Sequence, residues 1–174
     1  MTEKPDNGDI VAQAAVPILP DDTAGEVFDK VTLAAELALH GVLPALVAGT
    51  APRIRQDLGR GAYFGGRKPE DGRIDWSQPA ARIHNLVRAV APPYPGAFTD
   101  VDGRRLVIQR TRLVDAAAVH AEAPQLCSTA GHLYAECVAG ALEVLACTLD
   151  GAPLPPAQFE RQFGAAVPLP LMRK

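Results

Sequence analysis

The sequence predicts an α/β part, a linker helix and then a small antiparallel β-barrel. Two segments with helical spacing of apolar residues occupy the first half of the 174 residues, and short strand-like runs separated by turn signals fill the second half. A proline-rich stretch at 92–95 divides the two halves. Short strands with repeated turn signals are typical of barrels, so we expect the second half to form one.

The first predicted helix follows an extended run at residues 10–18. Thr23 and Glu26 form a capping box at its start. Apolar residues then recur at helical spacing: Val27, Val31, Ala34, Ala35 and Ala38. Gly41 and Pro44 predict either the end of this helix or a second short turn after it.

Residues 49–75 are predicted to form a long loop rich in glycine, arginine and aspartate. A loop of this length inside a compact chain more often has a function or forms an interface than serves only as a connection. Ser77 is the predicted N-cap of a second helix, with Pro79 in its first turn. His84 and Asn85 are expected on the polar side of that helix, as a cap or in an interdomain hydrogen bond.

Strand signals follow from residue 97 onward. Two strands, Ala97–Val101 and Arg104–Val114, are predicted to form a hairpin because Asp102-Gly103 between them is a strong hairpin turn. We expect further short strands around Leu126, at 132–138 and at 142–149, and a last helical turn at 156–161.

Composition narrows the class of protein. A 48% hydrophobic and 21% charged chain is typical of soluble globular proteins, and a net charge of −3 argues against broad nucleic-acid binding. The start of the chain is polar and no apolar run reaches the roughly 18–20 residues that span a bilayer, so we predict no membrane segment and a cytoplasmic location.

The three cysteines predict reduced thiols rather than a disulfide framework. Cys127, Cys137 and Cys147 are ten residues apart, a spacing that matches no zinc pattern, and we predict no metal site. Cys137 and Cys147 lie in apolar strand-like runs, which favours buried core thiols.

Asp6 is the first candidate functional residue. The sequence Asp6-Asn7-Gly8, followed at once by an apolar run, is typical of the edge of an active site, and residues 1–5 leave no room for a preceding strand or helix. We therefore expect this chain to begin inside a domain and the partners of Asp6 to come from elsewhere. The alternative for Asp6 is an Asx-turn before a strand.

Five motifs occur in the order and spacing of one known family: Gly8-Asp9-Ile10-Val11-Ala12-Gln13, Phe64-Gly65-Gly66-Arg67-Lys68-Pro69-Glu70-Asp71, Ile74-Asp75-Trp76-Ser77-x-Pro79-Ala80, His84-Asn85-Leu86-Val87-Arg88-Ala89-Val90 and Tyr94-Pro95-Gly96-Ala97-Phe98. The chain resembles the folate-dependent formyltransferases, which include methionyl-tRNA formyltransferase and the sugar N-formyltransferases. It is most similar to the branch that formylates UDP-4-amino-4-deoxy-L-arabinose in lipid A modification. The resemblance covers residues 2–114 well and the rest loosely.

The resemblance implies a domain order. Residues 1–76 would be the C-terminal edge of a truncated Rossmann-like formyltransferase domain, 77–95 a linker helix, and 96–174 an OB-like antiparallel barrel. A first strand and helix without their sheet should leave an apolar face uncovered, so we expect poor stability.

The resemblance also implies site residues and a formyl donor. Asp6 corresponds to the catalytic aspartate of the family. Thr2, Glu3, Lys4 and Pro5, together with Asp6, correspond to the stretch that binds 10-formyltetrahydrofolate. The Asn-x-His motif and the His-x-Ser-Leu-Leu-Pro loop of the family are absent, which leaves enzyme activity open. Because an aspartate alone cannot supply proton transfer and oxyanion donors, we expect this fragment to be inactive alone.

For the acceptor, the resemblance implies a nucleotide sugar. Arg67 could pair with a diphosphate and Tyr94 could stack on a uracil ring. The alternatives are an ion pair of Arg67 with Glu70 or Asp71, and packing of Tyr94 against the linker. Two other functions stay open, methionyl-tRNA formylation and a non-catalytic interaction or structural remnant, and the missing N-terminal half is the expected protein partner.

Overall fold

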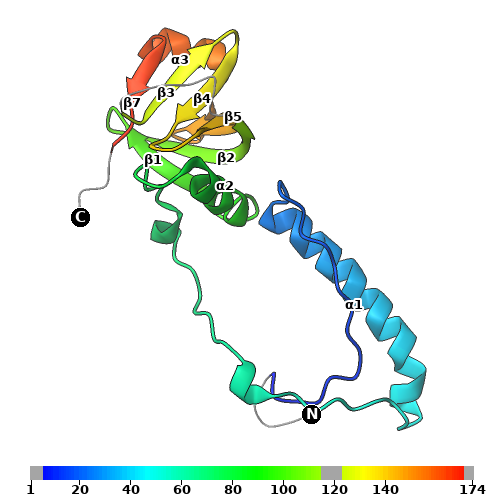
Figure 1. Cartoon of the computed structure of the whole chain (residues 1–174). Helices are drawn as coiled ribbons and strands as arrows, with labels where there is room; N and C mark the ends of the chain where they lie inside the picture. The colour runs from blue at the N-terminus through cyan, green and yellow to red at the C-terminus, as the bar shows by residue number, and fades with distance from the viewer. Residues whose placement is uncertain (1–5, 115–122, 171–174) are drawn as a thin grey trace. The chain divides into compact units, whose positions relative to one another are not determined.

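The computed structural model describes residues 6–114 and 123–170, and the chain divides into two compact units (Figure 1). The N-terminal unit comprises residues up to 20 and residues 26–66, and the barrel unit comprises residues 21–25 and those from 67 onward. The predicted boundaries at residues 76 and 95, and the donor-binding role of Thr2, Glu3, Lys4 and Pro5, stay predictions. Those four residues lie outside the described part of the chain.

The N-terminal unit is built around one long helix. Helix α1 (Ala24–Val47) begins directly after Thr23, where the capping box predicts it. The run at 10–18 forms no strand in the described chain; Ile10 makes a single antiparallel bridge with Ile54. A Rossmann-like sheet is therefore not among the described residues of this unit.

The end of α1 corrects the sequence prediction. The helix passes through both Gly41 and Pro44 and ends at Val47, two residues before Gly49, which has a φ of +73°. The amide of Gly49 bonds the carbonyl of Leu46 and the amide of Thr50 bonds that of Ala45, the pattern of a Schellman C-cap. Because this stretch of α1 is largely exposed, water can satisfy the carbonyl that Pro44 leaves without a donor.

Most of α1 is exposed, which confirms the expected uncovered apolar face. Of its 24 residues only Val42 is buried. Its large exposed apolar side chains are Phe28, Val31, Leu33, Leu37, Leu39, Leu43, Leu46 and Val47. The helix is also long and apolar enough to cross a membrane by length and composition, a test that the core helix of a soluble protein passes as well. The prediction that the chain has no membrane segment therefore stays a prediction.

The predicted loop at 49–75 is confirmed as irregular chain with two short 3₁₀ helices, η1 (Leu58–Arg60) and η2 (Pro69–Gly72). The helix that follows, α2 (Ala80–Ala89), has Pro79 and not Ser77 at its N-cap. The carboxylate of Asp75 instead accepts bonds from the amide and the hydroxyl of Ser77, at 3.0 and 2.6 Å. A residue before proline is held in extended backbone, so the helix starts only after Pro79.

The barrel unit contains one antiparallel sheet in the order β1-β2-β5-β4-β3-β7, with β6 paired to β5 (Figure 1). Its strands are β1 (Ala97–Val101), β2 (Arg104–Val114), β3 (Gln125–Thr129), β4 (His132–Glu136), β5 (Ala141–Leu149), β6 (Ala152–Pro153) and β7 (Ala166–Pro168). The sheet curls into an incomplete barrel, which confirms the antiparallel class predicted for this half. Its assignment as OB-like stays a prediction.

The predicted hairpin is confirmed to the residue. Val101 pairs with Arg104, and the turn residues Asp102 and Gly103 have φ values of +49° and +75°, as a type I′ turn requires. Asp150-Gly151 forms an equivalent turn after β5. The last helix, α3 (Pro156–Phe163), extends two residues past the predicted turn.

Two helices cover the sheet and close its core. Helix α2 packs on β2 and β5, and α3 packs on β3 and β7 (Figure 1). Trp76 and Phe159 are fully buried, and the indole N–H of Trp76 donates to the hydroxyl of Thr99 at 3.0 Å. The segments at 67–72 and 92–96 thus adjoin a packed apolar core.

Candidate functional site

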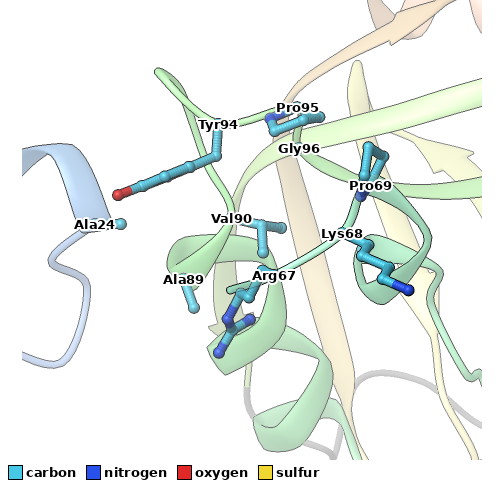
Figure 2. Close-up of a pocket in the computed structure, with 10 residues that line it drawn as sticks. Ala24, Arg67, Lys68, Pro69, Ala89, Val90, Tyr94, Pro95 and Gly96 are labelled. Atoms are coloured by element: carbon cyan, nitrogen blue, oxygen red, sulfur yellow. The ribbon is translucent and has the colours of Figure 1, made fainter. Parts of the chain in front are cut away.

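A cavity of about 430 Å³ lies on the barrel unit (Figure 2). Four segments form it: the start of α1, η2 with the residues before it, the end of α2, and the turn at 92–96. The lining residues are Ala24, Arg67, Lys68, Pro69, Gly72, Ala89, Val90, Tyr94, Pro95 and Gly96. The structure therefore brings together Arg67 and Tyr94, the two acceptor residues predicted from the sequence.

Two glycines allow these segments to approach one another. A Cβ on Gly72 would lie 2.7 Å from the carbonyl oxygen of Gly96, closer than real contacts allow. Gly96 has a φ of +90°, and a Cβ there would lie 2.5 Å from a methyl carbon of Val107. The amide of Gly96 bonds the carbonyl of Val90 at 2.8 Å, which fixes the turn against α2.

The lining of the cavity includes two cationic side chains and an exposed aromatic ring. Arg67 has no ion pair among the described residues, and the carboxylate of Asp71 instead accepts a bond from the backbone amide of Lys68 at 2.8 Å. Tyr94 is 54% exposed, and in Figure 2 its ring projects from the turn toward Ala24 while the amino group of Lys68 points away from it. An unpaired guanidinium and an exposed ring that line one cavity can bind an anionic ligand that contains a flat heterocycle.

The predicted catalytic residue, Asp6, lies in a turn of the N-terminal unit. Its φ is +65°, and its carbonyl accepts a hydrogen bond from the side-chain amide of Gln56 at 2.9 Å. A polar cavity of about 450 Å³ adjoins this turn. It is lined by Asn7, Asp9, Arg55, Gln56, Asp57 and Leu58. The structure thus supports the turn that the Asp-Asn-Gly sequence predicts, whereas the catalytic role of Asp6 stays a prediction.

In the described part of the chain, no histidine pairs with Asp6. His84 is buried on α2, where its Nδ1 lies 2.9 Å from the Thr111 hydroxyl and its Nε2 lies 3.3 Å from a carboxylate oxygen of Asp21. Its predicted place on the polar side of the helix was wrong, because this turn of α2 packs on β2. His84 links α2, β2 and residue 21 of the barrel unit.

Sequence reasoning missed a charged cluster on the sheet. Glu143 on β5 is buried and accepts bonds from Arg112 on β2 and from Nδ1 of His132 on β4, the latter at 2.7 Å. Burial alone would raise the pKa of Glu143, but the hydrogen bonds and charges of His132 and Arg112 lower it below its usual value of 4.5. Cross-strand register, which one sequence does not reveal, brings these groups together.

The thiols are not activated for chemistry. Burial raises the pKa of Cys137 to about 12 and that of Cys147 to about 11, and burial together with the carboxylate of Glu136 raises that of Cys127 to about 11. Cys147 is buried in β5 and Cys137 is partly buried against the core, as the sequence predicts. Thiols with such pKa values remain protonated near neutral pH.

A family model described as "Formyl transferase, C-terminal domain" matches residues 67–164, more than half of the chain. The chain belongs to this family. The match begins at Arg67 and ends in the last turn before β7, so it covers most of the barrel unit. Asp6, Gln56 and the whole of α1 lie outside the matched residues.

Solved structures share the fold at low sequence identity. HypX from Aquifex aeolicus matches with a TM-score of 0.72 and 18% identity over 94% of this chain, and another HypX structure holds tetrahydrofolic acid. An N-formyltransferase from Helicobacter canadensis, in complex with folinic acid and dTDP-3-aminofucose, matches with a TM-score of 0.62 and 16% identity over 80%. This chain spans 29% of the HypX chain and 50% of the N-formyltransferase.

Proposed function

We propose that this chain is part of an enzyme that transfers a formyl group from 10-formyltetrahydrofolate to the amino group of a nucleotide-linked amino sugar. The observation that carries the proposal is the cavity on the barrel unit, where Arg67 and Tyr94 lie together on a formyl transferase C-terminal domain. UDP-4-amino-4-deoxy-L-arabinose is the acceptor that the sequence motifs favour. The dTDP-amino sugar bound by the structurally similar N-formyltransferase supports an acceptor of this class.

The side chains that bind the acceptor would be separate from those that take part in formyl transfer. The guanidinium of Arg67 matches a diphosphate in charge and geometry, and the ring of Tyr94 offers a face for the base. Because neither group touches the amine, both would contribute to binding rather than to the chemical step. Substitution of either side chain is therefore expected to raise KM and to change kcat less.

Asp6 would act in the chemical step through a histidine. The folate donor supplies an activated formyl carbon when it is bound. A carboxylate beside an imidazole favours the protonated ring, so Asp6 would hold a catalytic histidine in place and tune its proton transfer. The polar cavity beside the Asp6 turn has two carboxylates, two amides and a guanidinium, which fits a donor ring with both hydrogen-bond donors and acceptors.

The histidine and the oxyanion donors would come from residues other than those described here. Neither His84 nor His132 is near this role, because both are bound within the barrel unit. Loss of an oxyanion donor costs roughly 10²–10³ in rate, so the chain alone should show no measurable turnover. A catalytic half supplied in the same or another polypeptide should restore it.

A formyl-transfer assay tests this function. The chain is incubated with 10-formyltetrahydrofolate and UDP-4-amino-4-deoxy-L-arabinose, alone and with the N-terminal half of a sugar N-formyltransferase, and the formamide product is detected by mass spectrometry. We expect product only in the mixture. Asp6→Asn should lower kcat by roughly 10²-fold or more, whereas Arg67→Ala should raise KM for the sugar. Arg161→Ala, an exposed arginine on α3, is the matched control.

The other outcomes separate the alternatives. Formylation of methionyl-tRNA, with binding that weakens steeply as salt rises, would replace the sugar with tRNA as the acceptor. Turnover by the chain alone would contradict the requirement for a catalytic half. If no acceptor is formylated in any mixture, the chain is a non-catalytic interaction or structural protein.

A further inference from the structure

A side chain far away in the sequence clamps the turn that contains Asp6. The amide nitrogen of Gln56 donates to the carbonyl oxygen of Asp6 at 2.9 Å and to that of Gly8 at 2.6 Å. The two carbonyls are 50 and 48 residues away along the chain. An amide NH₂ group has two donor hydrogens, and both are used here.

The backbone next to the clamp is held in register by one bridge. The amide of Ile10 bonds the carbonyl of Ile54 at 2.9 Å, and the amide of Ile54 bonds the carbonyl of Ile10 at 3.0 Å. This bridge aligns the two segments but does not continue into a ladder toward Asp6. The conformation between Asp6 and Gly8 therefore depends on the side chain of Gln56.

The turn contains a residue in the left-handed region of backbone conformation. Asp6 has a φ of +65°, which aspartate adopts more readily than most residues but which is still uncommon outside glycine. Two carbonyls that converge on one amide fix the chain on both sides of Asn7. They thereby fix the backbone from which the Asp6 carboxylate projects.

We propose that Gln56 is a positioning residue that holds the Asp6 turn in its reactive conformation. The inference rests on the proposed function, in which Asp6 acts in the chemical step. The neutral amide of Gln56 reaches both carbonyls and supplies the two donors that this geometry uses. A glutamate carries no donor when ionised, and an asparagine is one methylene shorter.

The first test measures the turn itself, in the complete 174-residue chain. NMR gives the hydrogen-exchange protection of the Ile10 and Ile54 amides and the one-bond Cα–Hα coupling of Asp6, which reports a positive φ. In Gln56→Ala we expect protection to fall about tenfold and the coupling signature to be lost, since two hydrogen bonds disappear. Gln13→Ala, an exposed glutamine of the same unit, should change neither.

A pH series on Gln56→Glu distinguishes a donor role from simple filling of space. Above roughly pH 5 the ionised glutamate should repel the two carbonyls and abolish the signature. Below roughly pH 4 its neutral carboxyl can donate one bond, so the signature of Asp6 should partly return. Wild type, compared at each pH, should show no such recovery. A Gln56→Glu chain that keeps the wild-type signature at neutral pH would overturn the proposal.

The second test is turnover in the mixture with the catalytic half. A loosened Asp6 turn should lower kcat by roughly 10–100-fold and leave KM for the sugar unchanged. Wild-type kcat in Gln56→Ala, despite a loosened turn, would overturn the positioning role. If wild type itself gives no turnover, the proposed function fails while the NMR measurements still decide whether Gln56 fixes the turn.

Discussion

The barrel unit buries Trp76 and Phe159 completely, whereas α1 in the N-terminal unit has one buried residue among 24. The barrel unit joins a sheet, two helices and an apolar core into one structure. The N-terminal unit consists of a helix, two segments joined by a single bridge, and the Gln56 clamp. The family match falls on the barrel unit, and the candidate catalytic turn falls on the other.

This difference in burial shows what stabilises the structure of each unit. Burial stabilises the barrel unit, because its apolar side chains leave water. Helix α1 gains little from burial within the described chain, so its boundaries depend on local signals such as the capping box and the Gly49 cap. We therefore expect the N-terminal unit to unfold first and the barrel unit to unfold separately.

The largest expected effect comes from a core truncation in the barrel unit. Phe159→Ala should lower the free energy of unfolding by about 3–5 kcal/mol, because it removes a fully buried ring from α3. Leu37→Ala on α1, where the side chain is 64% exposed, should change it by less than about 0.5 kcal/mol. Urea unfolding measures both. Equal losses of unfolding free energy in the two variants would show that α1 is buried in solution and would contradict the difference in burial between the units.

A smaller effect is expected from the glycine beneath the cavity. Gly96→Ala should cost about 1–3 kcal/mol, because the new methyl group would overlap Val107 at a positive φ. Gly151→Ala is the matched control, with a similar φ of +85° and open space around it. It should cost about 1 kcal/mol, the strain of the backbone alone. If thermal unfolding shows equal costs, close approach at Gly96 does not shape this cavity.

The smallest effect is a pH dependence within the barrel unit. Because the folded-state pKa of Glu143 is lowered, its ion pairs contribute stability above the unfolded value of 4.5, and that stability is lost as pH falls through the lower folded value. Glu143→Gln should remove about 1 kcal/mol near neutral pH and flatten the dependence of Tm on pH below 4.5. An unchanged slope in the variant would assign the acid sensitivity to other carboxylates.

Local signals in the sequence predicted a large part of the barrel. The Asp102-Gly103 turn gave the hairpin to the residue, because few other residues accept its positive φ values. By contrast, β6 and β7 have two and three residues, contain prolines and depend on neighbouring strands, so no pattern reveals them. Helix α1 is longer than predicted because water can bond the carbonyl that Pro44 leaves without a hydrogen-bond donor.

The candidate sites were predicted only in part, because sequence reveals local signals and not contacts between distant segments. Arg67 and Tyr94 were identified as separate motif residues, but their shared cavity depends on the contact between Gly72 and Gly96, which is long-range. Gln56 was missed because its bonds to Asp6 and Gly8 join segments about fifty residues apart. Side chains that act across such separations leave no periodic signal in the sequence.

A titration with UDP tests the central claim most directly, because it needs only this chain. The account predicts saturable NMR shift changes at residues 67–72 and 92–96, and Arg67→Ala should weaken binding by roughly tenfold or more through loss of a charge-assisted bond. Arg161→Ala should bind as wild type does. Shifts confined to the cavity lined by Asn7 and Arg55, or no saturable shifts at all, would contradict an acceptor site on the barrel unit.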